Sequence, residues 1–225
     1  MGISERNQKM TKIKMDEIID GMEKALRSKS YDRLTIDDVA KEAEYSKKTV
    51  YSYFRSKEEI RLALLNRKFN LFYEKLQNAT EGSGKRGIEK IVLLGRAYYG
   101  FAKEYPEYMQ AIIDFEAKTP TGDPETDGMT ERFNRETGKS FLLLEEAVKE
   151  AIEDKTIVGA TDAASTAVLL WAGINGFITL ACKKGEYMKS CCGKSVDELF
   201  SECLGLALRS LGRCSRKDLQ EETAE

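Results

Sequence analysis

Apolar residues recur along this chain at intervals of three and four, and almost nowhere in the alternating pattern of a β-strand. Only three prolines interrupt the pattern. We therefore expect an all-α protein with about nine helices. The predicted helices span residues 11–28, 35–43, 46–54, 56–78, 88–105, a shorter segment ending near 116, and then 130–154, 162–183 and 196–212.

Residues that cap helices stand directly before several of these segments. Thr35 is followed three positions later by Asp38, and Ser56 is followed by Glu59, which is the S-x-x-E pattern of a capping box. Ser46 precedes the third helix in the same way. These residues predict the amino-terminal ends of three helices.

Breaks in the helical pattern and the distribution of charge divide the chain into parts. Glycine-rich TEGSGKRG at 80–87 and the loop signal KTPTGDPETDG at 118–128 separate later helices. We expect a domain over residues 1–65, a larger helical domain over 66–215, and a tail over 216–225 that has no apolar face.

The net charge of −2 hides a difference between the two ends of the chain. Residues 1–68 contain 16 Lys and Arg against 12 Asp and Glu, or +4, and the remainder contains 20 against 26, or −6. A polyanionic partner would therefore bind at the amino-terminal end.

The composition favours a soluble protein of the cytoplasm. The first twenty residues contain no apolar h-region of a secretory signal. The longest apolar run, 167–181, is shorter than a membrane span and contains Asn175 and two glycines, so no membrane is expected as a partner. Five cysteines fit reduced thiols, and without histidine or a C-x-x-C motif no metal and no cofactor is predicted. Thiol sensing or soft-metal binding by these cysteines stays open as the alternative.

The two short helices at 35–43 and 46–54 are joined by so few residues that they must cross steeply, as in a helix-turn-helix. If the second helix enters the major groove of double-stranded DNA, its first turn presents Lys47, Lys48 and Thr49. The two lysines are candidates for reading bases. The alternative is that they form a solvated helix face.

Further hydroxyl and amino groups near this helix suit a sugar-phosphate backbone. Tyr51 and Tyr53 carry phenolic hydroxyls, and Lys57 lies in the first turn of the next helix, where free N–H groups also attract phosphate. Thr35 and Ser46 are caps that can also contact phosphate. A packing role for either tyrosine remains open.

The stretch LTIDDVAKEAEYSKKTVYSYFRSKEEI resembles the DNA-binding signature of TetR/AcrR-family transcriptional regulators. The matching positions are Thr35, Val39, Ala40, Ala43, Ser46, Thr49, Tyr51, Tyr53, Phe54, Lys57 and Glu58. Two features depart from the family. Glu44-Tyr45 replaces the usual Gly-Val, so Glu44 is expected to adopt a left-handed conformation at a cost of about 1 kcal/mol, and Lys48 replaces a small residue.

This resemblance covers roughly residues 11–65 and implies a homodimer that binds operator DNA. It also implies that the remaining helices bind a small-molecule effector and form the dimer. The residues themselves show many large apolar side chains that suit a cavity for an apolar or aromatic ligand, or equally a packed core. The candidate ligand residues are Tyr98, Phe101, Tyr105, Tyr108, Met109, Phe115, Phe141, Trp171 and Asn175.

Asn175 interrupts the most apolar helix, and a buried amide there needs a partner from a ligand, a neighbouring helix or its copy in a dimer. Wide apolar faces on the last two long helices predict a four-helix dimer interface. The candidate dimer residues are Ile174, Ile178, Phe200, Leu204 and Leu211.

We therefore expect a transcriptional regulator, most simply a repressor, that binds a palindromic operator and responds to a small apolar or aromatic ligand. One alternative is a DNA-binding protein that responds to no ligand. The other is an all-α enzyme that uses the aromatic cavity, against which stands the lack of any histidine, G-x-S-x-G motif or phosphate-binding loop in the sequence. Activation in place of repression stays open.

Overall fold

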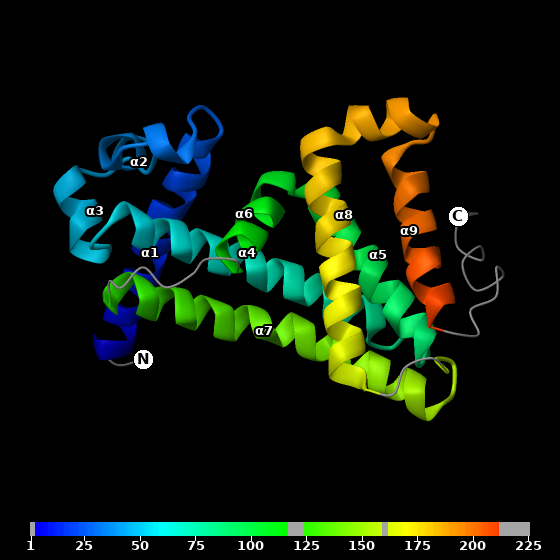
Figure 1. Cartoon of the computed structure of the whole chain (residues 1–225). Helices are drawn as coiled ribbons and strands as arrows, with labels where there is room; N and C mark the ends of the chain where they lie inside the picture. Colours follow the sequence, from blue (N-terminus) through cyan, green and yellow to red (C-terminus); the bar gives the residue numbers. More distant parts are fainter. Residues whose placement is uncertain (1–2, 117–123, 159–161, 212–225) are drawn as a thin grey trace. The chain divides into compact units, whose positions relative to one another are not determined.

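The computed structural model describes residues 3–116, 124–158 and 162–211, and within these ranges it contains helices and no strand (Figure 1). The prediction of an all-α fold is confirmed. The described residues form one short 3-10 helix, η1, and nine α-helices. Their bounds are α1 Ile3–Leu26, η1 Tyr31–Arg33, α2 Ile36–Glu42, α3 Lys47–Tyr53, α4 Lys57–Thr80, α5 Ile88–Glu104, α6 Pro106–Glu116, α7 Pro124–Glu153, α8 Ala163–Cys192 and α9 Val196–Ser210.

The chain separates into two compact units, and the division falls inside α4 between Lys68 and Phe69. The first unit contains α1, η1, α2, α3 and the first half of α4. The second contains the rest of α4 and the five helices that follow it. Each unit has its own apolar interior.

In the first unit, α1 packs closely on α2. Ile18 and Met22 on α1 and Val39 on α2 are fully buried. At Gly21 a Cβ atom would lie only 2.6 Å from the Cβ of Ala43, so the two helices approach each other at a point where α1 has no side chain.

Helix α1 begins eight residues earlier than the sequence pattern predicts. Residues 3–10 contain no apolar stripe from which a helix could be predicted. The structure agrees with this, since residues 5–13 are all exposed. Glu5, Arg6, Gln8 and Lys9 nevertheless favour helix by intrinsic propensity. Hydrophobic periodicity marks the packed part of a helix and misses an exposed extension.

The interior of the second unit is built around aromatic rings from α4 and α5. The ring centroid of Phe72 lies 4.8 Å from that of Tyr98 and 5.1 Å from that of Phe101. Phe69 contacts the edge of Phe133 on α7, with centroids 6.4 Å apart. These large side chains bury the apolar area that stabilises this unit.

Two predicted boundaries in the second unit are wrong. Helix α7 begins at Pro124, inside the predicted loop 118–128, because proline suits the first turn of a helix; residues 118–123 lie outside the described ranges. Helix α8 does not end at Lys183 but continues to Cys192 through a kink at Lys184, whose φ of −141° and ψ of 29° are not helical. The predicted helix end at Lys183 therefore coincides with the kink inside α8.

Among the described residues, α8 alone is long and apolar enough to cross a membrane by length and composition. The apolar run at 167–181 is itself shorter than a membrane span, but the helix extends beyond it on both sides. Length and composition are weak evidence for a span, since apolar helices of soluble proteins pass the same test. Only 17% of the apolar window is buried within this chain.

Candidate functional site

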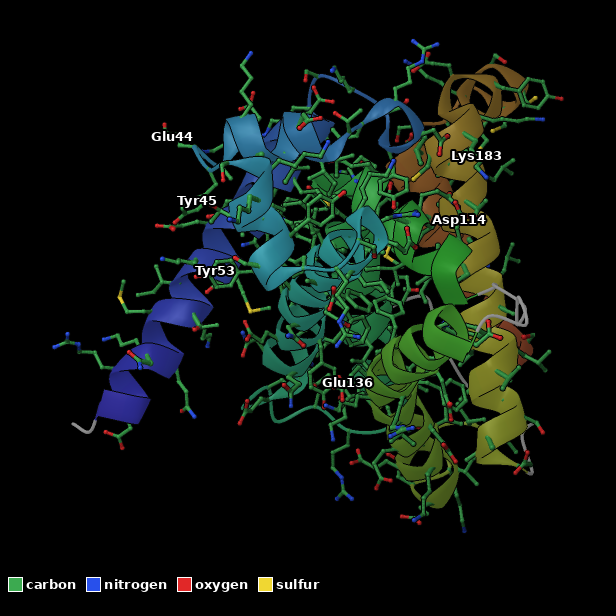
Figure 2. The ribbon with its side chains drawn as sticks, turned by 90° about the vertical axis from the view of Figure 1, so that its left-hand side faces the viewer. Glu44, Tyr45, Tyr53, Asp114, Glu136 and Lys183 are labelled. Atoms are coloured by element: carbon green, nitrogen blue, oxygen red, sulfur yellow. The ribbon has the colours of Figure 1, made fainter. Side chains whose placement is uncertain are left out.

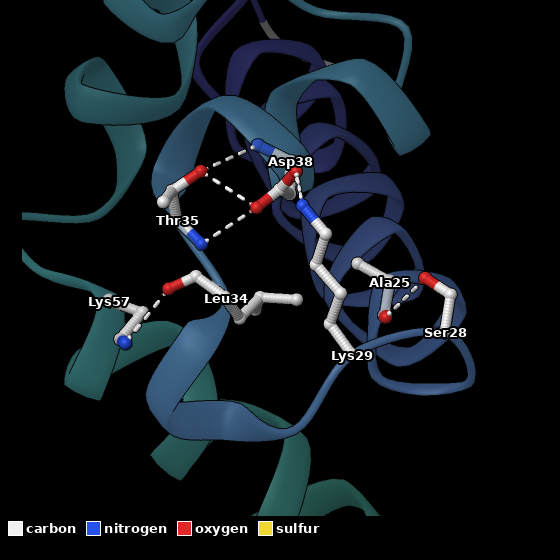
Figure 3. A network of polar contacts seen from close by, with 7 residues as sticks. All are labelled: Ala25, Ser28, Lys29, Leu34, Thr35, Asp38 and Lys57. Carbon is white, nitrogen blue, oxygen red and sulfur yellow. Dashed lines mark hydrogen bonds and ion pairs between the residues drawn. The ribbon is translucent and has the colours of Figure 1, made fainter.

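The start of α2 is held by a capping box (Figure 3). The Thr35 hydroxyl accepts a hydrogen bond from the Asp38 N–H at 3.2 Å, and the Asp38 carboxylate accepts one from the Thr35 N–H at 2.9 Å. Lys29 adds an ion pair to Asp38 at 2.5 Å. The hydrogen bonds from Lys29 and from the Thr35 N–H lower the pKa of Asp38. The cap predicted at Thr35 is thus present. Its hydroxyl accepts a hydrogen bond from the N–H of Asp38 and donates one to the Asp38 carboxylate.

The turn between α2 and α3 is a Schellman motif. The N–H of Tyr45 donates to the carbonyl of Ala40 at 2.8 Å, and the N–H of Glu44 donates to the carbonyl of Lys41 at 3.2 Å. Glu44 has φ of +59°, so the left-handed conformation predicted for a non-glycine residue here is confirmed. Figure 2 shows Glu44 at the outer corner of the turn. Tyr45 ties the turn to α1 by donating its hydroxyl to Glu17.

Helix α3 begins at the predicted Ser46 cap, whose hydroxyl accepts from the Thr49 N–H at 3.1 Å. Its first two lysines differ. Lys47 is paired with Asp37 of α2 at 2.9 Å, whereas Lys48 is exposed and has no side-chain partner among the described residues. Tyr51 is 49% exposed on the same side of the helix. Lys48 and Tyr51 are therefore the α3 side chains most available to an external partner.

The two residues predicted to complete a phosphate clamp are less free. The Lys57 ammonium donates to the carbonyl of Leu34 at 2.9 Å (Figure 3). The same ammonium donates to the carbonyl of Tyr31 at 3.0 Å, so two of its three donors are used inside the unit. It also lies 4.3 Å from the ring centroid of Tyr31. Tyr53 is half-buried beside α1, with the Lys14 ammonium 5.9 Å from its ring centroid. Lys57 therefore joins η1 to α4, a role that the sequence pattern did not reveal.

The second unit contains an apolar cavity of about 100 Å³. Of the predicted ligand residues, Tyr98, Phe141 and Trp171 line it. Sequence reasoning missed the aliphatic part of the wall, because leucine and isoleucine at a helical interval look the same in a core and in a cavity. The other lining residues are Leu76, Ile91, Leu94, Gly95, Ser140, Leu144, Leu169, Leu170, Gly173, Ile174, Phe177, Phe200, Cys203, Leu204 and Ala207.

Other predicted ligand residues do not reach this cavity. Phe101 and Met109 are fully buried in the packed interior. The ring of Tyr105 lies beside Phe101, and the ring of Tyr108 lies beside Tyr105. Phe101, Tyr108 and Met109 are core residues because α6 folds back on α5, whereas Tyr105 is half-buried. The side chain of Phe115 lies outside those that the structure describes.

Asn175 is buried and has a partner within its own chain. Its Oδ1 accepts a hydrogen bond from the Tyr98 hydroxyl at 2.6 Å, which joins α8 to α5. Of the three partners that the sequence left open, the structure shows the neighbouring helix. The pair also holds the Tyr98 hydroxyl, so the polar end of a cavity residue is already engaged.

The residues predicted for a dimer interface differ in their surroundings within the chain. Ile178 and Phe200 are buried in the interior, where Phe200 stacks on Tyr99 with ring centroids 4.0 Å apart. Ile174 and Leu204 line the cavity, and Leu211 is half-buried just after α9. Ile178 and Phe200 are thus covered within their own chain, whereas Ile174, Leu204 and Leu211 remain partly exposed, and the dimer role of the five residues stays a prediction. Large apolar residues that are exposed on these helices are Val168, Leu169, Leu180 and Leu206.

The described cysteines are not joined in disulfides. Cys182, Cys191 and Cys192 are exposed and Cys203 is half-buried, while Cys214 lies outside the described ranges. Within the described residues no group of three or more His, Cys, Asp or Glu side chains could hold a metal ion.

Comparison with known families agrees with both units. Residues 18–64 match the family model of bacterial regulatory proteins of the tetR family, and residues 91–207 match that of a tetracyclin repressor-like C-terminal domain. The chain belongs to the TetR/AcrR family of transcriptional regulators. No curated protein matches this chain in sequence.

Solved structures share the fold of this TetR/AcrR-family chain over most of their length. A protein of unknown function from Rhodococcus sp. RHA1 superposes with a TM-score of 0.70 at 22% identity, covering 88% of this chain and 95% of its own. A TetR/AcrR-family regulator from Thermobifida fusca gives 0.64 at 19%, with coverage of 89% and 98%. The regulator FadR from Bacillus subtilis, in complex with stearoyl-CoA, gives 0.62 at 20%, with coverage of 85% and 96%. At such identities the likeness shows the fold.

Proposed function

We propose that this regulator is a dimeric repressor that binds palindromic operator DNA and releases it when a small, largely apolar or aromatic ligand binds. In this proposal residues 1–65 bind DNA, and residues 66–215 bind the ligand and the second subunit. The observation that carries the proposal is the exposed face of α3. Lys48 and Tyr51 lie on this face, and α3 is the second helix of the helix-turn-helix and is capped by Ser46. A helix presented in this way fits the major groove.

The exposed apolar side chains of α8 and α9 support a dimer. Leu169 is 72% exposed and Leu206 is 63% exposed, and a second copy would remove such residues from water. Dimerisation also has a geometric purpose, because two recognition helices must lie about 34 Å apart to enter successive major grooves. A ligand that favours another separation weakens binding.

The cavity supports an apolar ligand and limits its size. Apart from Tyr98, Ser140, Trp171 and Cys203, the lining side chains are hydrocarbon. Its volume of about 100 Å³ is smaller than the ~150 Å³ of an engineered cavity that binds benzene, so a long acyl chain such as that of stearoyl-CoA would require the wall to open. This small volume also favours a second candidate, a DNA-binding regulator that responds to no ligand.

Footprinting on the DNA that flanks the gene for this protein tests the proposal. We expect a protected palindrome, and we expect protection to disappear when an aromatic or fatty acid ligand is added. Lys48→Ala should lower the preference for the operator by about tenfold or more, the value of one lost base contact. Lys24→Ala, which removes an exposed lysine from the last turn of α1, is the control and should leave the footprint unchanged.

The outcomes separate the candidates. Protection that no ligand abolishes supports the regulator without an effector. A monomeric protein that protects no fragment at moderate salt overturns the proposal as a whole.

A further inference from the structure

Helix α1 extends beyond the part of the chain that the family model describes. The match to the tetR family begins at residue 18, but the helix begins at Ile3. We call residues 3–14 the α1 extension. Its described residues up to Ile13 are all exposed, and Figure 2 shows this part of α1 continuing past Tyr45 and Tyr53 with no other helix of the first unit packed on it.

Most of the positive charge of the first unit lies in the α1 extension. The extension holds four basic residues and one acidic residue, or 4−1=+3, while residues 1–68 together hold 16−12=+4. Residues 15–68, which include the whole helix-turn-helix, therefore carry only 12−11=+1. A helix-turn-helix that is nearly neutral has little general attraction for a polyanion.

The basic residues outside the extension are largely occupied within the unit. Lys29 and Lys47 are paired with Asp38 and Asp37, and Arg67 bridges to two acidic residues of α1. In contrast, the side chains of Arg6, Lys9 and Lys12 form no hydrogen bond or ion pair within the described chain. Exposed charges without partners contribute little to folding, but they remain available to phosphate.

One side of the α1 extension lies next to the recognition helix α3. Lys14 places its ammonium 5.9 Å from the ring centroid of Tyr53, the last residue of α3. Arg6 lies eight residues earlier, which is roughly 12 Å along the helix and about 80° around it. Lys12 is about 160° around the helix from Lys14, so it points to the opposite side.

We propose that the α1 extension is a second DNA contact, in which Arg6 and Lys14 bind phosphates next to the groove that α3 enters. This inference rests on the proposed function, because it needs α3 on DNA. The extension supplies affinity without sequence information, since phosphates are the same at every base pair. The partner is thus the backbone of the duplex that also holds the recognition helix.

The test uses the full-length protein and a fluorescently labelled 30-base-pair duplex of arbitrary sequence, because binding to phosphate does not require the operator. Anisotropy titrations over a series of salt concentrations give the slope of log K against log salt. In the proposed dimer, the double variant Arg6→Gln/Lys14→Gln removes two phosphate contacts from each subunit, four in all, and should reduce this slope by about 3.6. Arg6→Lys/Lys14→Arg keeps both charges and should retain the wild-type slope.

A matched control separates a contact from a general effect of charge. Lys12→Gln/Lys24→Gln removes the same charge from α1 at other places, because Lys12 points away from Lys14 and Lys24 lies about 15 Å further along the helix than Lys14. This control should change the slope by less than about 0.5. Circular dichroism verifies that all variants keep their helix content. Equal slopes for the two Gln double variants, or no change in either, overturn the inference. Wild-type protein that binds no duplex at low salt refutes the proposed function instead.

Discussion

Gly21→Ala is the sharpest test of how the helix-turn-helix unit is assembled. In an isolated helix this change stabilises by about 1 kcal/mol, because alanine loses less backbone entropy than glycine on folding. In this fold the added methyl group would lie 2.6 Å from the Cβ of Ala43, 2.8 Å from its nitrogen and 2.9 Å from the carbonyl oxygen of Val39. Two of these three atoms belong to the backbone, so no side-chain rotation can relieve the contact.

The magnitude follows from the two opposing effects. Overpacking a tight contact with one methyl group typically destabilises by about 1–3 kcal/mol, and the upper part of this range applies where the backbone of α2 must move. The gain in helix propensity offsets about 1 kcal/mol. We expect Gly21→Ala to lower the free energy of unfolding by about 1–2 kcal/mol.

Urea denaturation followed by circular dichroism at 222 nm measures this change. The matched control is Gly100→Ala in α5, where nothing lies within 4 Å of the added Cβ, so that the propensity gain acts alone and the midpoint rises. The single tryptophan, Trp171, lies in the second unit and reports its unfolding by fluorescence. A midpoint for Gly21→Ala that rises as it does in the control would refute the close approach of α1 and α2.

Two further predictions concern hydrogen bonds within each unit. Tyr98→Phe leaves the buried Oδ1 of Asn175 without the donor at 2.6 Å and should destabilise by about 1–3 kcal/mol in thermal unfolding. Adding Asn175→Leu should recover part of this loss, and a double variant less stable than Tyr98→Phe would contradict the pairing. Lys29 and the Thr35 N–H lower the pKa of Asp38, so the stability from this cluster is complete above the ordinary carboxyl pKa of about 4 and is lost as pH falls further. Urea midpoints of Asp38→Asn should therefore fall less than those of wild type between about pH 4 and pH 2, and parallel pH profiles would exclude this role.

Local signals predicted the features that depend on neighbours in the sequence. The caps at Thr35 and Ser46 and the left-handed Glu44 all follow from contacts within a few residues, and the structure shows each of them. Pro124 shows a limit of this reasoning. Its position predicts a loop, yet it begins α7, because proline suits both a turn and the first turn of a helix.

Long-range packing decided which predicted residues lie at a site. Phe101 and Trp171 look alike in the sequence as large apolar residues on helices, but Phe101 is fully buried beside Phe72 and Trp171 lines the cavity. Lys57 looks like a phosphate ligand, but the carbonyls of Tyr31 and Leu34 accept two of its hydrogen bonds. Neither difference has a signal in the local pattern.

The sequence by itself determined the helices, their caps and the helix-turn-helix, because these depend on residues within one or two turns of each other. Only the tertiary structure decided which way each helix face points and which cations remain free. The physical reason is that periodicity shows that a face is apolar but does not show what covers it. Whether Leu204 contacts a cavity, a core or a second subunit depends on helices that are far away in the chain.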